Sequence, residues 1–198
     1  MWKYVCPLGK PCNNKNALLG RGCFGHTYRM RHDVDGRTCA VKQVVTASVS
    51  EAVALARLPP HDHVVRYYDC RIVFRHLWVI MELVGSGKTV HPGVHSKWAN
   101  TIIKQVAGAL SHIHHHGVVH RDVKHSNLLV RPRRPLQAIH VVLADFGFAT
   151  GGGAVARGHL VYRAPESIHD KASDVWQLGV LALELQNGVN ADDMVGNS

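Results

Sequence analysis

Three glycines near the start of the chain have the spacing of a phosphate-binding turn. Gly20, Gly22 and Gly25 form the pattern G-x-G-x-x-G, and glycine lets backbone N–H groups approach phosphate oxygens closely because it has no side chain. Dinucleotide-binding folds and ordinary glycine turns also produce this pattern, but a dinucleotide fingerprint opens a helix. Here the glycines lead into a strand-like run, so the sequence favours a glycine-rich turn between two strands.

Four further segments follow in a fixed order and carry charged or polar residues. They are V-K at Val41 and Lys42, H-R-D-x-x-x-x-N from His120 to Asn127, D-F-G from Asp145, and A-P-E from Ala164. Together with the glycine turn, this order resembles that of the eukaryotic protein kinase family over residues 18–185. The resemblance implies an α+β, two-lobed fold, in which a small antiparallel sheet lobe and a helical lobe hold MgATP between them.

The same resemblance implies a role for each polar residue in phosphoryl transfer, which depends on positioning and on neutralising the charge of ATP. Lys42 would hold the α- and β-phosphates, and Asp122 would orient the acceptor hydroxyl and take its proton. Lys124 would steady the γ-phosphate, and a lysine two residues after the aspartate is typical of the Ser/Thr type. Asn127 and Asp145 would bind Mg²⁺ through oxygen atoms that suit this hard cation.

Nucleotide binding would involve residues from both sides of the predicted cleft. The resemblance makes Met81 the gatekeeper, although a methionine there also fills the core. The resemblance also implies that the backbone of Glu82 and Val84 bonds to the adenine. The other residues expected at the ATP site are Leu19, Gly20, Arg21, Gly22, Cys23, Phe24, Gly25, Thr27, Ala40 and Leu129.

Three supporting residues match the family, and each has a simpler alternative. Glu51 is predicted to form an ion pair with Lys42, and the alternative is a capping box that begins at Ser48. Asp174 would accept hydrogen bonds from the H-R-D backbone, unless it is a surface aspartate. Arg121 would receive a phosphorylated activation loop, unless it is an ordinary surface cation.

The chain departs from the family pattern at several positions. Thr27 replaces the valine that covers the adenine, and Lys88 lies where an acidic or polar residue contacts the ribose. His159 replaces the threonine that bridges the catalytic aspartate and lysine. These departures keep open an alternative function, a kinase-like module that binds ATP or a protein partner without efficient transfer.

The elements expected around these residues change character along the chain. The first half predicts strands at residues 25–30, 38–45, 64–68 and 77–81, with a turn at Asp35 and Gly36 and one short helix at 50–58. Apolar residues three and four apart predict a long helix at 98–115. We therefore expect a kinase domain over residues 15–198, with a sheet lobe at 15–84, a helical lobe at 85–198 and an extension at 1–14.

A glycine-rich stretch between these two lobes has a second interpretation. Residues 85–89 resemble the end of a Walker A loop, but the glycine that this motif needs five residues before Gly87 is Glu82. A Walker A loop is therefore rejected, and the stretch is predicted to act as a hinge.

The resemblance implies further helices after the one that holds Asp174, whereas the sequence stops at Ser198. This predicts a truncated lower lobe in which Glu166 lacks its arginine partner. It also predicts that residues 176–185, which are mostly apolar, are covered by self-association or by a partner protein, and that kinase activity is low.

Composition limits the remaining classes of function. The chain has 198 residues, of which 46% are hydrophobic, and a net charge of +9. Charge alone does not identify an acidic partner, and without a recognition motif nucleic-acid binding is not predicted. An odd number of scattered cysteines predicts an intracellular location, in the cytoplasm or nucleus, and no apolar run predicts a membrane span. The histidines at 112 and 114–116 suggest a metal site only weakly, because no cysteine pair with zinc spacing lies nearby.

Overall fold

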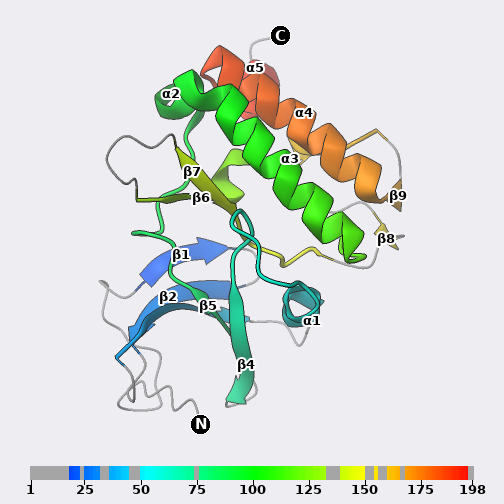
Figure 1. The fold of residues 1–198 in the computed structure, drawn as a ribbon. Coiled ribbons are helices and arrows are strands. Elements are labelled where there is room, and N and C mark those ends of the chain that lie inside the picture. The colour runs from blue at the N-terminus through cyan, green and yellow to red at the C-terminus, as the bar shows by residue number, and fades with distance from the viewer. Residues whose placement is uncertain are drawn as a thin grey trace.

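The computed structural model describes residues 18–22, 25–31, 36–44, 50–73, 76–132, 139–149, 154–155, 160–165 and 168–195. Within these residues, the chain forms a sheet lobe followed by a mainly helical lobe (Figure 1). The α+β, two-lobed arrangement predicted from the sequence is therefore present.

The first lobe is an antiparallel sheet of five strands in the order β1-β2-β3-β5-β4. β2 and β3 pair in unbroken register from Gly25 opposite Val44 to Arg31 opposite Thr38. Gly36 lies in their connection with a φ of 69°, which favours glycine, whereas Asp35 of the predicted turn is outside the described residues. The strands are β1 (Leu18–Gly22), β2 (Gly25–Arg31), β3 (Thr38–Val44), β4 (Tyr67–Val73) and β5 (His76–Glu82).

The alternation of side chains along β3 decides where its lysine points. Cys39 and Val41 are buried with Ile80 in a small apolar cluster on one face of the sheet. Because successive side chains of a strand point to opposite faces, Ala40 and Lys42 lie on the other face, which looks toward the helical lobe. The apolar pattern of β3 therefore directs Lys42 into the space between the lobes.

Two boundaries in this lobe differ from those predicted. The predicted strand at residues 64–68 begins only at Tyr67. Val64 and Val65 are buried, and the backbone groups on either side of Val64, the His63 carbonyl and the Val65 N–H, bond to Leu143 of the helical lobe instead of to the sheet. Helix α1 (Ser50–Ala56) ends two residues before the predicted Leu58. Pro59 and Pro60 follow, and the residue before a proline is driven away from helical dihedrals.

The second lobe is built around two long helices that lie side by side in Figure 1. α3 (Ala99–His115) matches the predicted helix within one residue at its start, and its buried residues recur at the spacing of one helical face. The other elements are α2 (Pro92–His95), α4 (Lys171–Asn187), α5 (Ala191–Val195), the 3₁₀ turns at Ser96–Trp98, His125–Asn127 and Leu160–Tyr162, and two small sheets, β6 (Leu128–Arg131) with β7 (His140–Leu143) and β8 (Ala154–Val155) with β9 (Ile168–His169).

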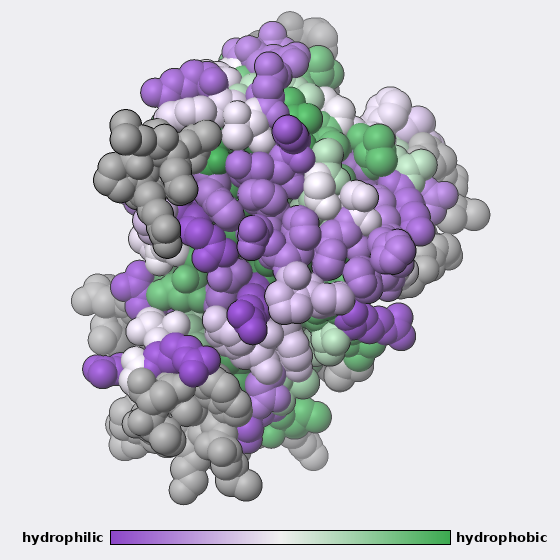
Figure 2. All heavy atoms as spheres, in the orientation of Figure 1, coloured by the Kyte–Doolittle hydropathy of each residue, from purple (hydrophilic) through white to green (hydrophobic). Residues whose placement is uncertain are grey.

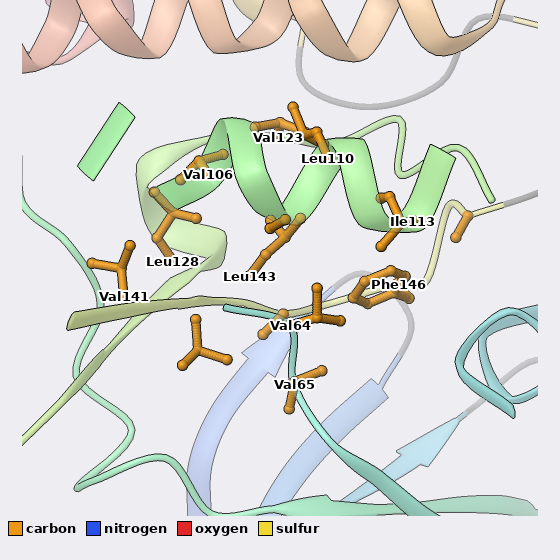
Figure 3. Close-up of a cluster of buried hydrophobic side chains, with 14 of the residues drawn as sticks. Val64, Val65, Val106, Leu110, Ile113, Val123, Leu128, Val141, Leu143 and Phe146 are labelled. Carbon is orange, nitrogen blue, oxygen red and sulfur yellow. The ribbon is translucent and has the colours of Figure 1, made fainter. Parts of the chain in front are cut away.

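The main apolar core lies between α3, the β6–β7 hairpin and residues 64–65 (Figure 3). In this view Ile113 of α3 lies above Phe146, and Leu110 lies beside Val123 on the other side of the helix. Val106, Leu110, Ile113, Leu143 and Phe146 are all buried. Each such burial contributes roughly 1.5–3 kcal/mol relative to exposure. This packing fixes the chain on either side of Asp145.

Helix α4 has well-defined ends and an unusual distribution of side chains. Asp170 and Ser173 form a capping box at its start, and Gly188 ends it in a left-handed conformation. Val175, Trp176 and Leu183 are exposed along it, and we call these three residues the outer face of α4. Figure 2 shows hydrophobic residues interrupting the hydrophilic surface over this helix. Among the helices in the described parts of the chain, none is long and apolar enough to span a bilayer.

Histidine side chains gather where residues 59–63 pack against α3 and β7. The ring centroids of His61 and His112 are 4.7 Å apart, those of His63 and His140 are 4.6 Å apart, and those of His112 and His116 are 4.6 Å apart. Three of these rings form hydrogen bonds with carbonyl oxygens across the contact between residues 59–63 and the helical lobe. His112 bonds to Pro59, His140 to Asp62 and His63 to Val141. The cluster therefore attaches residues 59–63 to the helical lobe.

The protonation of His61 is expected to weaken the fold. Burial, followed by the nearby His112 and His63, lowers the pKa of His61 below its ordinary value. The unfolded chain therefore binds a proton on His61 more readily than the folded chain does. The contribution of neutral His61 to the free energy of unfolding is complete above about pH 6.5, and it is lost as the pH falls through the lower pKa of the folded state. His61 Nδ1 also accepts the His63 N–H at 3.2 Å, and a proton on Nδ1 would break this bond.

His61→Asn tests this prediction, because an asparagine oxygen can accept the same N–H and does not titrate. We expect the melting temperature of the wild-type chain to fall more than that of His61→Asn between about pH 7.5 and about pH 5.5. Differential scanning calorimetry measures both, and His26→Asn in β2 serves as the control. Equal losses in all three proteins would contradict the prediction.

Candidate functional site

Three ionisable side chains, from β3, from α1 and from the segment after β7, meet between the lobes. Lys42 of β3 places its Nζ 2.7 Å from Glu51 Oε2 of α1 and 2.7 Å from Asp145 Oδ1, which follows β7. Lys42 and Glu51 are almost fully buried, whereas the Asp145 side chain keeps 37% of its surface exposed. The predicted Lys42–Glu51 ion pair is therefore present, and Ser48 of the alternative capping box lies outside the described residues.

The pKa values of these three groups reflect a balance between burial and pairing. Burial works to lower the pKa of Lys42, but the carboxylates of Glu51 and Asp145 outweigh it and hold the pKa above its usual value. Burial raises the pKa of Glu51, and Lys42 offsets this only in part. For Asp145, the charge and hydrogen bond of Lys42 overcome burial, so its pKa is lowered. Lys42 and Asp145 are thus charged at neutral pH.

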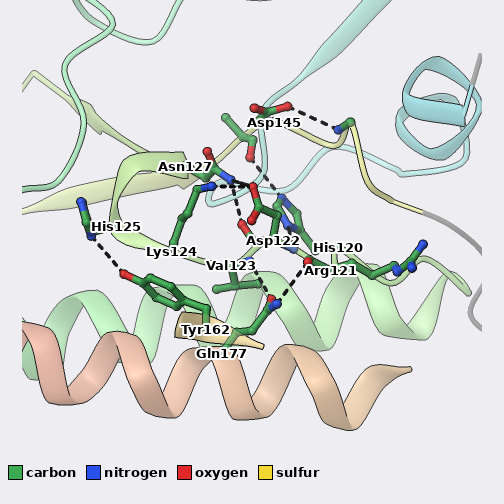
Figure 4. Close-up of polar contacts among 12 residues, drawn as sticks. His120, Arg121, Asp122, Val123, Lys124, His125, Asn127, Asp145, Tyr162 and Gln177 are labelled. Carbon is green, nitrogen blue, oxygen red and sulfur yellow. Dashed lines mark hydrogen bonds and ion pairs between the residues drawn. The ribbon is translucent and has the colours of Figure 1, made fainter. Parts of the chain in front are cut away.

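A second group of polar side chains lies on the loop between α3 and β6 (Figure 4). Lys124 Nζ is 2.9 Å from Asp122 Oδ2. Asn127 Nδ2 donates to the Asp122 carboxylate at 2.8 Å and to the Asp122 carbonyl at 2.7 Å. These bonds fix the Asn127 amide so that Oδ1 is the atom left to bind a cation, and they hold the Asp122 carboxylate in one position.

This loop is anchored from below by α4. The Asp174 carboxylate is fully buried and accepts the backbone N–H groups of His120 at 2.8 Å and Arg121 at 2.7 Å, and it lies 2.8 Å from His114 Nε2. One turn later, Gln177 accepts the Val123 N–H and donates to the Arg121 carbonyl. The predicted contact of Asp174 with this backbone is confirmed, and the alternative of a surface aspartate is wrong.

Two residues of the site have a backbone conformation that is rare outside glycine. Arg121 has a φ of 71° and Asp145 a φ of 62°, and such strain persists only where the surroundings impose it. Asp174 and Gln177 impose it on Arg121 through the backbone bonds above. At Asp145, the next residue, Phe146, is fully buried and packs edge-on against His120 at 4.7 Å. Arg121 itself is buried, so the alternative of a surface cation is wrong, although no phosphorylated partner is present to test its predicted role.

The glycine turn joins β1 to β2 and lies opposite Asp145. A Cβ on Gly22 would come within 4.0 Å of Asp145 Oδ2, and Gly25 has a φ of 144° and no room for a side chain beside Gln43. The two strands pair antiparallel, so the turn does not open a helix and the dinucleotide alternative is wrong. Gly22 therefore presents a backbone without a side chain to Asp145.

One cavity of about 500 Å³ connects the ion pair, the glycine turn and the polar side chains of Asp122, Lys124 and Asn127, and its volume suits a nucleotide-sized ligand. Its lining brings together most of the predicted residues, namely Leu19, Gly20, Arg21, Gly22, Gly25, Thr27, Ala40, Lys42, Glu51, Met81, Glu82, Val84, Asp122, Lys124, Asn127, Leu129 and Asp145. Val65, Thr89, Ala144 and Phe148 also line it and were not predicted. Cys23, Phe24, His159 and Glu166 lie outside the described residues, so predictions about them are not addressed.

The chemistry of this lining suits a magnesium-bound polyphosphate. Asn127 Oδ1 and the Asp145 carboxylate are hard oxygen ligands, and the glycine turn and Lys42 supply N–H groups and positive charge for phosphate oxygens. Elsewhere in the described structure, no set of three or more His, Cys, Asp or Glu side chains could hold a metal ion.

Sequence reasoning missed a cluster beneath the loop. His125 Nδ1 is 3.1 Å from both Tyr162 Oη and Glu184 Oε2, and the Tyr162 hydroxyl also bonds to Glu184. Glu184 is buried and accepts the Ala191 N–H at 2.5 Å as well. The sequence feature that could have indicated this cluster is Glu184, a carboxylate in the mostly apolar helix α4 that lies on the same helical face as Asp174 and Gln177.

Comparisons with known proteins agree with this geometry. The family model described as "Protein kinase domain" matches residues 13–191. The serine/threonine-protein kinase sid1 of Schizosaccharomyces pombe is 30% identical over 193 residues, which cover 86% of this chain and 40% of that protein. The mitogen-activated protein kinase kinase kinase YODA of Arabidopsis thaliana is 30% identical over 93% of this chain and 24% of its own length. A probable myosin light chain kinase of Dictyostelium discoideum is 29% identical over 86% of this chain and 60% of its own length. The chain thus spans less than two thirds of each of these relatives.

The buried carboxylate of Asp174 provides a direct test of this architecture. Asp174→Ala leaves two buried backbone donors without an acceptor, at about 1–3 kcal/mol each, so we expect the free energy of unfolding to fall by about 2–6 kcal/mol. Asp170→Ala, in the same helix, removes only an exposed N-cap and should cost about 0.5–2 kcal/mol. Urea unfolding measures both variants, and equal losses would show that Asp174 does not anchor the loop.

Proposed function

Because this chain belongs to the protein kinase family, we propose that it is an active serine/threonine protein kinase, which transfers the γ-phosphoryl group of MgATP to a serine or threonine hydroxyl of a protein. The observation that carries the proposal is the convergence of Lys42, Asp122, Asn127 and Asp145 on one cavity. Phosphoryl transfer needs a cation, metal ligands and a carboxylate near the acceptor, held in fixed positions.

In this proposal, the upper part of the cavity binds the nucleotide. Lys42, held by Glu51 and Asp145, contacts the α- and β-phosphates, while the glycine turn offers backbone N–H groups to phosphate oxygens. Leu19, Ala40, Met81 and Leu129 supply apolar surface for the adenine, and the backbone of Glu82 and Val84 lies beside it. Asn127 and Asp145 hold Mg²⁺, which when bound neutralises charge on the transferred phosphoryl group.

The lower part of the cavity acts on the protein acceptor. Asp122 accepts a hydrogen bond from the acceptor hydroxyl and then its proton, which is why its carboxylate is held by Asn127. Lys124 lies 2.9 Å from the same carboxylate, so its positive charge is positioned for the γ-phosphate. This lysine also supports the choice of serine or threonine as the acceptor.

Phosphotransfer from labelled ATP to a generic protein acceptor tests this function. We expect label on serine and threonine, and we expect Asp122→Ala to lower the transfer rate by about 10²–10⁴-fold, the usual contribution of a proton acceptor. Asp122→Ala should still be stabilised by millimolar MgATP in a thermal-shift titration, because ligands that bind the folded state raise apparent stability. Asp145→Asn should lose both transfer and most of the stabilisation by MgATP.

The outcomes separate the two functions considered for this chain. Stabilisation by MgATP without transfer would support the non-catalytic module and contradict the enzyme. No stabilisation by MgATP would contradict both. Phosphotyrosine as the main product would contradict the serine/threonine assignment alone. The ATP requirement and the scattered cysteines also support an intracellular location as part of this proposal.

A further proposal concerns the outer face of α4, which we expect a second copy of the chain to cover. Each large apolar side chain left in water forfeits roughly 1.5–3 kcal/mol, so covering Trp176 and its neighbours stabilises an assembly. We predict that the chain sediments as a dimer or larger species and that Trp176→Glu shifts it toward monomer. Ile72→Glu, at an exposed apolar residue of β4, is the matched control. A wild-type chain that sediments as monomer at all concentrations tested would contradict this proposal.

A further inference from the structure

The ring of His125 points away from the residues around it in the sequence. Its neighbours Lys124 and Asn127 extend toward Asp122, whereas His125 extends toward Tyr162 (Figure 4). His125 Nδ1 lies 3.1 Å from Tyr162 Oη and 3.1 Å from Glu184 Oε2 of α4. The loop is therefore attached to α4 at two places, by Asp174 and Gln177 at residues 120–123 and by His125 beyond them.

The partners of His125 are almost fully buried and are hydrogen-bonded to other groups. Glu184 is 1% exposed and Tyr162 is 3% exposed, and Glu184 also accepts the Tyr162 hydroxyl and the Ala191 N–H. Burial raises the pKa of Glu184, but the hydrogen bonds from His125, Tyr162 and Ala191 outweigh it and keep the pKa below its usual value, so Glu184 is a carboxylate at neutral pH. Because the Tyr162 hydroxyl donates to Glu184, both oxygens near His125 Nδ1 are acceptors, and Nδ1 carries the hydrogen in either charge state of the ring.

We propose that His125 is a positioning residue for the transfer step, whose Nδ1–H link to Glu184 and Tyr162 holds Lys124 and Asp122 against α4. The link also joins this loop to Leu160–Tyr162, so these two segments share one anchor on α4. Lys42 and the glycine turn lie on the sheet lobe and do not depend on His125. Its loss should therefore affect transfer more than nucleotide binding. The inference rests on the proposed kinase function.

The contact atom makes a matched set of variants possible. Nδ1 is separated from Cβ by one atom, as is the amide nitrogen of asparagine, whereas the amide nitrogen of glutamine is separated by two. His125→Asn can therefore restore the link, while His125→Gln keeps polarity and size but moves the donor. His125→Ala removes the donor altogether. His115→Ala, at an exposed residue near the end of α3, controls for the loss of a histidine.

Steady-state kinetics on the full chain tests the proposal. We expect His125→Ala and His125→Gln to lower kcat about ten- to a hundredfold, as displaced reacting groups do, with the KM for MgATP within about twofold of the wild-type value. His125→Asn should recover most of kcat, and His115→Ala should match the wild type. If the role of His125 were purely structural, the variants would have lower stability in thermal-shift measurements, but they would not show a lower kcat with an unchanged KM for MgATP.

The failure of this inference differs from the failure of the proposed function. If the wild-type chain transfers phosphate and His125→Gln has the wild-type kcat, the positioning role is overturned while the kinase function stands. Equal kcat losses in His125→Asn and His125→Gln would also overturn it, because the Nδ1 link would then not be the cause. If the wild-type chain transfers no phosphate, both the proposed function and this inference are overturned.

Discussion

A single buried carboxylate carries the arrangement of the loop that holds Asp122. Asp174 accepts two consecutive backbone N–H groups, at His120 and Arg121, and so keeps Arg121 in a left-handed conformation that a non-glycine residue seldom adopts. That conformation turns the chain so that Asp122 and Asn127 face the cavity. The buried charge would be costly without these donors, because carboxylates in an apolar interior must be hydrogen-bonded. The conformation of this loop and the burial of the Asp174 carboxylate therefore depend on each other.

The sheet lobe has a comparable constraint in Lys42. Its ammonium group is nearly inaccessible to solvent and lies 2.7 Å from carboxylates of α1 and of the segment after β7. Removing either carboxylate would leave a buried charge with less compensation, a change that is usually costly. The position of α1 is thus coupled electrostatically to the position of Asp145. A cation on the sheet and a carboxylate on α4 together set the geometry of the cavity from its two sides.

Much of the fold and of the site could be predicted from the sequence because the signals are local. The glycine turn, the periodicity of α3 and the short polar motifs each lie within a few residues, and the resemblance supplied their arrangement. The start of β4 was missed because the backbone of His63 and Val65 bonds to Leu143, which is far away in the sequence. The contacts of His125 with Tyr162 and Glu184 were missed for the same reason, since nothing near His125 in the sequence indicates a buried carboxylate beneath it.

The buried face of α4 mixes polar with apolar side chains. Ser173, Asp174, Gln177 and Glu184 are buried beside Leu181 and Leu185, whereas Val175, Trp176 and Leu183 are exposed. A helix in a soluble domain normally buries its apolar stripe, but here the inner face must accept or donate hydrogen bonds to the backbone of the loop above it. The apolar residues on the opposite side cannot serve that purpose. Because hydrogen-bonding groups share the inner face with Leu181 and Leu185, the exposed large apolar residues of α4 lie on its outer face, and hydrophobic periodicity separates the two faces of this helix only weakly.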